Sequence, residues 1–357
     1  MFNLLRCNLM DLPISFSINY YWSYGFVLSM FMCIQIITGV ILSFLYVSNF
    51  DVSFSIVTSF SNDSFFTWCL RYFHIIGVNI LFILVFIHMG RSLYYSSYNK
   101  ISVWNVGFLL YLLIMGEAFT GYILPWHQMS YWAATVLTSI VDSLPVVGSI
   151  IYKYVVGGFS ITGDTLMRVL SVHVCLGFII IMLMVIHLFY LHKDGSSNPL
   201  YNYNGLSDVI YFHSYFTAKD LFLFVSILTG VLSWLLLSPD LLVDIESYLE
   251  ADQLNTPVSI KPEWYFLAFY AMLRCIGSKI GGLMLVLCFL IFLWVPSSNV
   301  SSVYSVTRQI VFWFIISLYV SLTYLGTCHP EYPYLFVCQV FSVSLVVMML
   351  VFKLLNL

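Results

Sequence analysis

The sequence predicts an all-α membrane protein with eight transmembrane helices. Of its 357 residues, 61% are hydrophobic and only 8% are charged, which is far outside the range of soluble globular domains. A helix that crosses a bilayer needs about 20 apolar residues, and windows of that kind follow one another along the chain. They lie at about residues 22–47, 66–91, 104–125, 166–191, 218–238, 276–296, 308–327 and 334–355.

The distribution of basic residues favours one orientation of these helices, but by only seven residues against six, a difference that does not decide the orientation alone. An even number of spans leaves both termini on one side of the membrane, and if that side is the inner one, seven of the 13 lysine and arginine residues lie inside. An excess of basic residues inside is the usual direction. The two long connections, residues 126–164 and 238–275, then lie outside, and both are rich in aromatic residues, proline and glycine. Loops of this length and composition are typical of functional rather than disordered segments.

The second and fourth predicted helices each carry two histidines at the same interval. His74 and His88 are 14 positions apart, and so are His173 and His187. Fourteen residues of α-helix advance about 21 Å and make almost four turns, so both side chains lie on one face, near opposite edges of the bilayer core. The two helices run in the same direction because one helix separates them. His74 is therefore level with His173, and His88 with His187.

These levels predict two pairs of axial ligands for haem iron. A neutral imidazole binds a metal through one ring nitrogen and donates a hydrogen bond from the other, and haem iron accepts two such ligands. A single histidine in a membrane helix is more often a packing residue. The interval of 14 recurs on four consecutive helices, twice with histidine and twice with glycine, and this favours ligands. The eight cysteines include no C-x-x-C-H motif, so the predicted cofactors are two non-covalent b-type haems.

The first and third helices repeat the interval with glycine. Gly25 and Gly39 are 14 positions apart, as are Gly107 and Gly121. Glycine lets a flat macrocycle approach the helix backbone where a larger residue would clash. Since these helices run opposite to the histidine helices, Gly39 and Gly121 are expected to face the outer haem, and Gly25 and Gly107 the inner one. The first four helices are thus predicted to form a di-haem four-helix bundle.

Three arginines are candidates for binding the haem propionates. Arg71 precedes His74 by three residues and Arg91 follows His88 by three, in each case one helical turn further towards the water. Arg168, near the start of the fourth helix, is the third candidate. The alternative for each is an arginine at the membrane edge whose charged end extends into water.

Together these features make the chain resemble the cytochrome b family, the membrane subunits of quinol:cytochrome c oxidoreductase (complex III). The resemblance covers residues 22–352 and includes the motifs GYILPW at 121–126, GGFS at 157–160 and PEWYF at 262–266. Chloroplast relatives are split into two chains and have one more residue between the histidines of the fourth helix, so the respiratory form is favoured. The resemblance implies an N-terminal domain, residues 1–200, with the bundle and outer surface helices, and a C-terminal four-helix domain, residues 201–357.

The resemblance also implies an activity, partners and a location. Ubiquinol is oxidised at an outer site, and one electron passes to a Rieske iron-sulfur protein. The other crosses from the low-potential haem of His74 and His173 to the high-potential haem of His88 and His187 and reduces quinone at an inner site, coupled to proton translocation. A c-type cytochrome, other complex III subunits, membrane lipids and a dimeric complex are implied, and nucleic acid is not. The implied location is the mitochondrial inner membrane, with both termini on the matrix side.

The PEWYF motif predicts the outer quinol site. Pro262 keeps the approach to Glu263 non-helical, and a carboxyl group at an apolar boundary can accept a proton from quinol near neutral pH because desolvation raises its pKa. By resemblance Glu263 is the proton acceptor or hydrogen-bond partner of quinol, and Tyr265 supports it. The opposite wall is expected to contain Tyr122, Met129, Trp132 and Ala133.

The end of the fourth helix and the start of the fifth predict the inner quinone site. His192 can donate to one quinone carbonyl, while Asp220, with Ser196 and Lys219 close to it, can supply a proton to the other oxygen. The alternative is that His192 and Lys219 are interfacial residues without a ligand, and the resemblance favours the quinone site.

Three positions depart from the family. Ala133 and His127 stand beside the outer quinol site where glycine is usual, and Glu117 lies inside the third helix, four residues before Gly121. The methyl group of Ala133 is expected to hinder rigid inhibitors more than a flexible quinol, and His127 is expected to be a neutral loop residue. An ionisable group inside a membrane helix is costly unless it is paired, protonated or next to a cavity. Glu117 is therefore interpreted as a hydrogen-bonding group near the outer haem or the quinol site.

Two other classes of membrane protein carry histidines within their helices. A transporter or channel with a histidine proton path would have helices interrupted by glycine or proline and paired ionisable groups near the midplane. A two-haem anchor for a soluble dehydrogenase would need the four histidines but neither the PEWY motif nor four further helices. A reduced-minus-oxidised spectrum separates the first class from a haem protein, and ubiquinol-dependent reduction at two sites separates the second.

Overall fold

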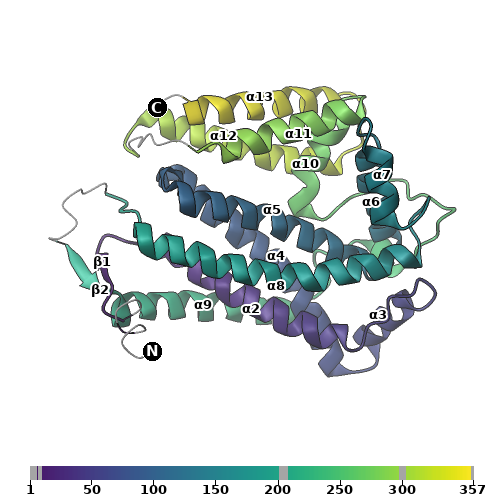
Figure 1. The fold of residues 1–357 in the computed structure, drawn as a ribbon, viewed down its shortest axis with the longest axis horizontal. Coiled ribbons are helices and arrows are strands. Elements are labelled where there is room, and N and C mark those ends of the chain that lie inside the picture. Colours follow the sequence, from purple (N-terminus) through teal and green to yellow (C-terminus); the bar gives the residue numbers. More distant parts are fainter. Residues whose placement is uncertain (1–5, 7–9, 201–207, 297–302, 355–357) are drawn as a thin grey trace. The chain divides into compact units, whose positions relative to one another are not determined.

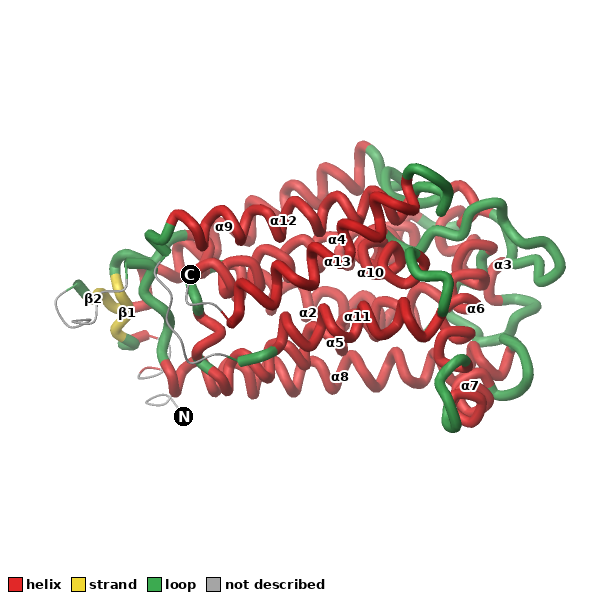
Figure 2. The backbone as a smooth tube through the Cα atoms, turned by 90° about the horizontal axis from the view of Figure 1, so that it is seen from above, coloured by secondary structure: helices red, strands yellow, loops and turns green. Residues whose placement is uncertain are grey.

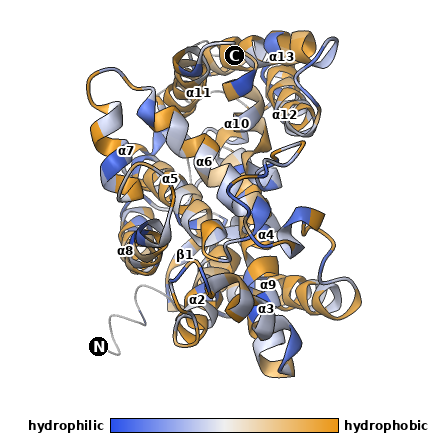
Figure 3. Cartoon of the chain, turned by 90° about the vertical axis from the view of Figure 1, so that its right-hand side faces the viewer, coloured by the Kyte–Doolittle hydropathy of each residue, from blue (hydrophilic) through white to orange (hydrophobic). Residues whose placement is uncertain are grey.

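The computed structural model describes residue 6 and residues 10–200, 208–296 and 303–354. The protein is an all-α membrane protein, as predicted, and apolar residues dominate its long helices (Figure 3). Within the described residues, seven helices are long and apolar enough to cross a membrane. These candidate spans are Tyr20–Ser43, Phe65–Tyr94, Ile101–Ile123, Gly163–Asp194, Phe212–Leu237, Val306–Thr327 and Tyr334–Lys353.

The sixth of the eight predicted windows, residues 276–296, forms a shorter helix. Helix α11, Lys279–Trp294, has 16 residues, which at 1.5 Å per residue is about 24 Å. That is less than the ~30 Å of a typical hydrocarbon layer. The window thus has the predicted place and apolar character, but its helix falls short of a full span within the described part of the chain.

The chain forms two compact units, each built from separate segments. The first contains residues 1–45, 60–114 and 177–241, and the second contains residues 46–59, 115–176 and 242–357. Helices α5, Ile101–Ile123, and α8, Gly163–Asp194, contribute residues to both units. The domain boundary predicted at residue 200 lies next to residues 201–207, which are outside the described residues, and it stays a prediction.

The first unit is built on three long helices, α2 (Tyr24–Ser43), α4 (Phe65–Tyr94) and α9 (Phe212–Leu237). Helix α2 packs against α4 and α9. Helix α9 is interrupted near its start by the non-helical backbone of His213 and Ser214. Short elements complete the unit: the 3-10 helices η2 (Tyr20–Trp22) and η3 (Ser97–Asn99), and strands β1 (Pro13–Ser15) and β2 (Val209–Tyr211), which pair antiparallel with Ile14 opposite Ile210 (Figure 2).

The second unit contains the C-terminal helices, which lie side by side (Figure 1). They are α10 (Trp264–Arg274), α11, α12 (Val306–Thr327) and α13 (Tyr334–Leu354). Two glycines allow their backbones to approach closely. A Cβ on Gly326 would lie 2.4 Å from the carbonyl oxygen of Leu267, and one on Gly282 would lie 2.1 Å from that of Leu273. Any side chain at either position would push α12 or α11 away from α10.

The two long connections contain ordered helices that position the residues of the PEWYF region. The first holds α6 (Gln128–Asp142) and α7 (Gly148–Val156), and the second holds η4 (Ile245–Tyr248) and leads into α10; α3 (Ser53–Asn62) lies in an earlier connection. A buried apolar cluster fixes α6 and α7 to the ends of α5 and α8. Its members are Ile123, Trp126, Tyr131, Ala134, Val156, Ile161, Leu166 and Val169.

His127 begins α6 as a capping residue. Its Nδ1 accepts from the backbone N–H of Ser130 at 3.0 Å, and its own N–H donates to the Ser130 hydroxyl at 3.2 Å. The side chain is 5% exposed and lies against Tyr122, with ring centroids 5.2 Å apart. A reciprocal cap of this kind satisfies two of the free N–H groups at a helix start, which explains the buried position of this histidine.

Candidate functional site

Each of the four glycines at the 14-residue interval contacts one of the four predicted ligand histidines. A Cβ added to any of these glycines would crowd the Cε1 atom of the facing imidazole. The pairs and the resulting distances are Gly25 and His88 (3.3 Å), Gly107 and His187 (3.0 Å), Gly39 and His74 (3.1 Å), and Gly121 and His173 (2.6 Å). The bare backbone therefore makes room for the imidazole rings themselves, whereas the sequence suggested room for a macrocycle.

His88 and His187 lie in the first unit with their rings close together. The ring centroids are 6.4 Å apart and the planes are inclined by 64°. A metal–imidazole bond is about 2 Å long and the ring centre lies about 1 Å behind the nitrogen, so two imidazoles on opposite sides of one metal have centroids about 6 Å apart. The observed separation fits that arrangement.

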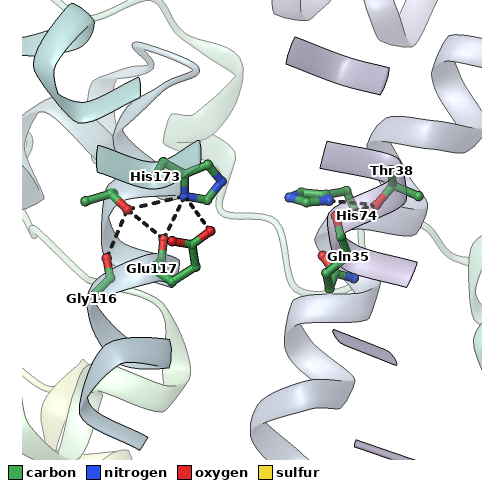
Figure 4. A network of polar contacts seen from close by, with 7 residues as sticks. Gln35, Thr38, His74, Gly116, Glu117 and His173 are labelled. Atoms are coloured by element: carbon green, nitrogen blue, oxygen red, sulfur yellow. Dashed lines mark hydrogen bonds and ion pairs between the residues drawn. The ribbon is translucent and has the colours of Figure 1, made fainter. Parts of the chain in front are cut away.

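His74, also in the first unit, is held by a threonine on α2. The Oγ1 atom of Thr38 lies 2.9 Å from Nδ1 of His74 (Figure 4). The hydroxyl hydrogen of Thr38 is directed to a backbone carbonyl, that of Ile34 at 2.9 Å or of Gln35 at 3.1 Å. The threonine oxygen therefore accepts from Nδ1–H, which leaves Nε2 of His74 with a lone pair for a metal.

His173, in the second unit, is surrounded by oxygen atoms of α5. Its Nδ1 lies 3.0 Å from the backbone oxygen of Glu117, 3.3 Å from the carboxylate Oε1 of the same residue and 3.3 Å from Oγ1 of Thr120 (Figure 4). The Thr120 hydroxyl donates to the carbonyl of Gly116 or Glu117, so all three oxygens can act as acceptors towards Nδ1–H. This ring, too, presents Nε2 as the unprotonated nitrogen.

At His88 the group next to Nδ1 is a hydrogen-bond donor, Arg91, whereas at His74 and His173 it is an acceptor. Its Nη2 atom lies 3.3 Å from Nδ1 of His88, and its guanidinium lies 5.2 Å from the ring of Trp22. Arginine can only donate, so Nδ1 of His88 is the acceptor, and in the neutral ring the proton is then on Nε2. The predicted propionate arginine is thus next to the predicted ligand but occupied with it.

The other two predicted propionate arginines have protein partners. Arg71 donates to the hydroxyl of Ser61 and lies over the Tyr72 ring. Arg168 is exposed and donates to the backbone carbonyl of Tyr154, in the last turn of α7. The contact of Arg168 complements the negative end of that helix, which gives this arginine a structural role at α7 beside its predicted one.

Glu263 and Tyr265 lie with Tyr122 and Asp244 in one region of the second unit. Glu263 precedes α10 with an extended backbone, and its side chain makes no capping hydrogen bond. Burial raises the pKa of Glu263 to about 7, and the charge of Asp244 adds to the effect. Burial also raises the pKa of Tyr265, followed by the charges of Glu263 and Tyr122. A carboxyl group with such a pKa exchanges protons near neutral pH.

The other predicted wall residues lie on α6. Met129 is 1% exposed, and its sulfur accepts from the backbone N–H of Lys261 at 3.2 Å, which ties the start of α6 to the residue before Pro262. Ala133 is buried. Trp132 packs against the buried apolar cluster, and its indole Nε1 is buried without an acceptor among the described residues. A buried donor of this kind is costly unless a ligand or water accepts from it.

The predicted inner quinone residues lie in the first unit. His192, in the last turn of α8, and Ser196 are exposed. Asp220 is 8% exposed and accepts a hydrogen bond from the Ser23 side chain. The ammonium group of Lys219 lies over three aromatic rings, those of Tyr20 (5.6 Å), Tyr215 (4.4 Å) and Phe216 (5.6 Å).

The two threonines that contact predicted ligand histidines were not among the predicted site residues, although the sequence contains a signal for them. QIITG at residues 35–39 and EAFTG at residues 117–121 share one pattern, in which threonine directly precedes the outer glycine of each pair. The repeat indicates that Thr38 and Thr120 occupy equivalent helix positions. It also aligns Gln35 with Glu117.

Comparison with known proteins covers nearly the whole chain. Residues 9–195 match the family described as Cytochrome b/b6/petB, and residues 250–346 match the family described as Cytochrome b(C-terminal)/b6/petD. The first segment contains the four glycine–histidine pairs, and the second contains the PEWYF motif. Among solved structures, the chain is similar to one described as "Hyperthermophilic respiratory Complex III", with a TM-score of 0.90 and 26% identity over 99% of this chain and 95% of that chain.

Proposed function

The chain belongs to the cytochrome b family, and we propose that it is the two-haem, quinol-oxidising subunit of a respiratory quinol:cytochrome c oxidoreductase. Membership of the family implies b-type haem and electron transfer in a quinol-oxidising complex. The likeness to a respiratory complex III over 99% of the chain supports the respiratory assignment. The observation that carries the proposal is the set of four glycine–histidine contacts at one repeated interval.

His88 and His187 are the proposed ligands of the inner, high-potential haem. Their 6.4 Å ring separation suits two imidazoles on one iron, and Gly25 and Gly107 back the two rings. Ligation through Nε2 of His88 requires its proton to move to Nδ1, and Arg91 must then leave Nδ1. The released guanidinium becomes available for a haem propionate.

His74 and His173 are the proposed ligands of the outer, low-potential haem. In both rings Nδ1 faces a threonine oxygen that can accept its hydrogen, so Nε2 is ready to bind iron without a change of tautomer. Gly39 and Gly121 back these rings. Of the outer arginines, Arg71 is the proposed propionate partner. Arg168 is a further proposed partner. Each arginine must first release its present acceptor, the Ser61 hydroxyl for Arg71 and the Tyr154 carbonyl for Arg168.

Bound haem supplies reversible one-electron chemistry, and the chain supplies its ligands and the two quinone sites. At the outer site Glu263 accepts a proton from ubiquinol, because burial holds its pKa at about 7. Tyr265, whose pKa burial raises, is a proposed hydrogen-bond donor beside it, and Tyr122 is a further proposed partner. Pro262, Met129, Trp132 and Ala133 form the wall, with the Trp132 indole as a further donor.

At the inner site His192 is the proposed donor to one quinone oxygen and Asp220 the proton source for the other. His192 is exposed in the last turn of α8, while buried Asp220 has the Ser23 side chain as its hydrogen-bond partner. Ser196 and Lys219 complete the site. Since the Lys219 ammonium is held over aromatic rings, its proposed role is to favour negative charge on the bound quinone rather than to carry protons.

The proposed partners and location are those that the resemblance to complex III implies, and the likeness to a multi-subunit respiratory complex supports a complex of several subunits. A Rieske iron-sulfur protein takes one electron of each quinol, and a c-type cytochrome subunit carries it onward within a dimeric complex III that includes further subunits and bound lipids. The proposed location is the mitochondrial inner membrane. If α11 crosses the membrane as the eighth span, as its apolar character supports, both termini lie on one side. The proposed side is the matrix.

The transporter and the two-haem anchor are less well supported. A transporter does not account for four imidazoles that each contact a glycine at one repeated interval. An anchor does not account for the second family match at residues 250–346 or for a glutamate of pKa about 7 beside the buried Tyr265.

The proposal is tested by rapid mixing of the purified complex with ubiquinol while b-type absorption is recorded. The native complex is expected to reduce its haems by two routes. Glu263→Gln should close the outer route, Asp220→Asn should slow the inner one, and the double variant should lose quinol-driven reduction. Glu250→Gln, which changes an exposed glutamate of the same outer connection, is the matched control. Complete loss of reduction in either single variant would favour a one-site anchor.

A further inference from the structure

Helices α2 and α5 carry the same five-residue pattern with one chemical difference. QIITG at residues 35–39 begins with an amide, and EAFTG at residues 117–121 begins with a carboxyl group. In both, the first residue lies four positions before a glycine that contacts a ligand histidine, so it is one helical turn away on the same face. Gln35 and Glu117 have nearly the same size and differ in the end of the side chain, which is an amide in one and a carboxyl group in the other.

The side chain of Gln35 is directed away from the imidazole of its level. Its amide lies against Gly77 of α4, where an added Cβ would be 1.8 Å from Nε2. The residue is 7% exposed, and neither Nε2 nor Oε1 has a hydrogen-bond partner in the part of the chain that the structure describes. The amide therefore packs between α2 and α4.

The side chain of Glu117 is directed at its histidine. Oε1 lies 3.3 Å from Nδ1 of His173, next to the backbone oxygen of Glu117 at 3.0 Å (Figure 4). The second carboxylate oxygen, Oε2, is buried and has no hydrogen-bond partner among the described residues. A carboxyl group inside a membrane helix is costly unless it has a polar partner, and His173 is the side-chain partner that Glu117 has among the described residues.

We propose that Glu117 is a positioning residue that acts through Nδ1 of His173 and lowers the reduction potential of the haem ligated by that histidine. This inference rests on the proposed function, because it requires His173 to bind haem iron. A carboxylate that accepts from the second ring nitrogen makes the imidazole a more basic ligand. A more basic ligand favours the oxidised iron, which carries one more positive charge, so the reduced form becomes harder to reach.

The direction of the effect suits the proposed electron path. An electron moves from the outer to the inner haem when the outer haem has the lower potential. The carboxylate stands at His173, a proposed ligand of the outer haem, whereas the neighbour of the inner ligand His88 is a cation, Arg91. A negative group at one haem and a positive group at the other both widen the difference in potential.

The test is a redox titration of the assembled native complex and of Glu117→Gln, followed in the b-haem absorption bands. The variant keeps the size of the side chain and makes the two five-residue patterns alike. One b component is expected to become easier to reduce by about a factor of ten in its reduction equilibrium, about 59 mV for one electron. The other component serves as the internal control and should keep its midpoint. The low-spin EPR signal of the shifted haem should change as well.

A second variant, Glu117→Asp, keeps the charge but draws it back from Nδ1, and its midpoint should fall between those of the native complex and of Glu117→Gln. Unchanged midpoints and EPR signals in haem-replete Glu117→Gln would overturn the inference while leaving the proposed function intact. Equal shifts of both haems would also overturn it, since they would report a general disturbance. A native complex without b-type haem would instead refute the proposed function.

Discussion

The surroundings of His173 and of His88 differ in the kind of group that faces Nδ1. Around His173 three oxygen atoms of α5 accept from that nitrogen, whereas at His88 the guanidinium of Arg91 donates to it. Both histidines belong to pairs with the same 14-residue interval. The same helical spacing thus supports two chemically opposite environments, one prepared for metal ligation through Nε2 and one in which a cation must first be displaced.

The difference has a simple origin in the sequence. Thr120 and Glu117 lie within about one turn of Gly121 on α5, so they contact the His173 ring that packs against this glycine. Arg91 lies one turn after His88 on the same helix, so it reaches the ligand from its own chain segment. Acceptors therefore come from a neighbouring helix and the donor from the ligand helix itself.

Removal of a ligand has the largest expected effect and tests whether both environments bind haem. His173→Ala and His88→Ala should each lose one b-type component completely, and the lost components should differ in midpoint, the lower one missing in His173→Ala. Pyridine haemochrome content should fall to about half in each. A variant that keeps both components would show that its histidine is a packing residue.

The second unit contains another carboxyl group with a proposed acceptor role, Glu263. Glu263→Gln tests whether this group accepts the proton of quinol. Below pH 7 the buried carboxyl is mostly protonated and cannot accept from quinol; above its pKa of about 7 it is ionised. The native turnover is therefore expected to rise with pH between about 6 and 8, and the variant should lose about 10²-fold in turnover together with that rise. An equal pH profile in both proteins would exclude Glu263 as the titrating group.

Substitution of Gly121 and of Gly25 by alanine compares how much room each glycine leaves for a side chain next to its histidine. A Cβ would lie 2.6 Å from Cε1 of His173 on Gly121, but 3.3 Å from Cε1 of His88 on Gly25. Gly121→Ala is therefore expected to cost about 1–3 kcal/mol by overpacking, and Gly25→Ala less. Thermal release of haem from the two variants measures the order, and earlier release from Gly25→Ala would contradict the ranking.

Arg91→Gln has the smallest expected effect. It tests whether a cation and a carboxyl group change the haem reduction potentials in opposite directions. Loss of a cation beside His88 should make the inner haem harder to reduce, by less than about tenfold in the reduction equilibrium, opposite in sign to the change expected for Glu117→Gln. A shift in the same direction in both variants would mean that the charges of Glu117 and Arg91 do not set the two potentials.

The regular features of the molecule could be predicted from the sequence, because periodicity and length determine them. The helices, the histidine and glycine levels and the position of Glu263 before α10 follow from spacing and from proline chemistry. Residue spacing does not predict which group on another helix or loop a side chain will contact. Arg168 binds the end of α7, and His127 caps α6, because nearby backbone groups needed a donor or an acceptor. The repeated TG pair did carry such information, for Thr38 and Thr120.

The central claim is that four histidines bind two haems in different surroundings, and a potentiometric reduced-minus-oxidised titration of the purified complex tests it most directly. The expected result is two b-type components of equal size, well separated in midpoint, with the lower one assigned to His74 and His173. A complex with no b-type absorption, or with a single component, would contradict the account.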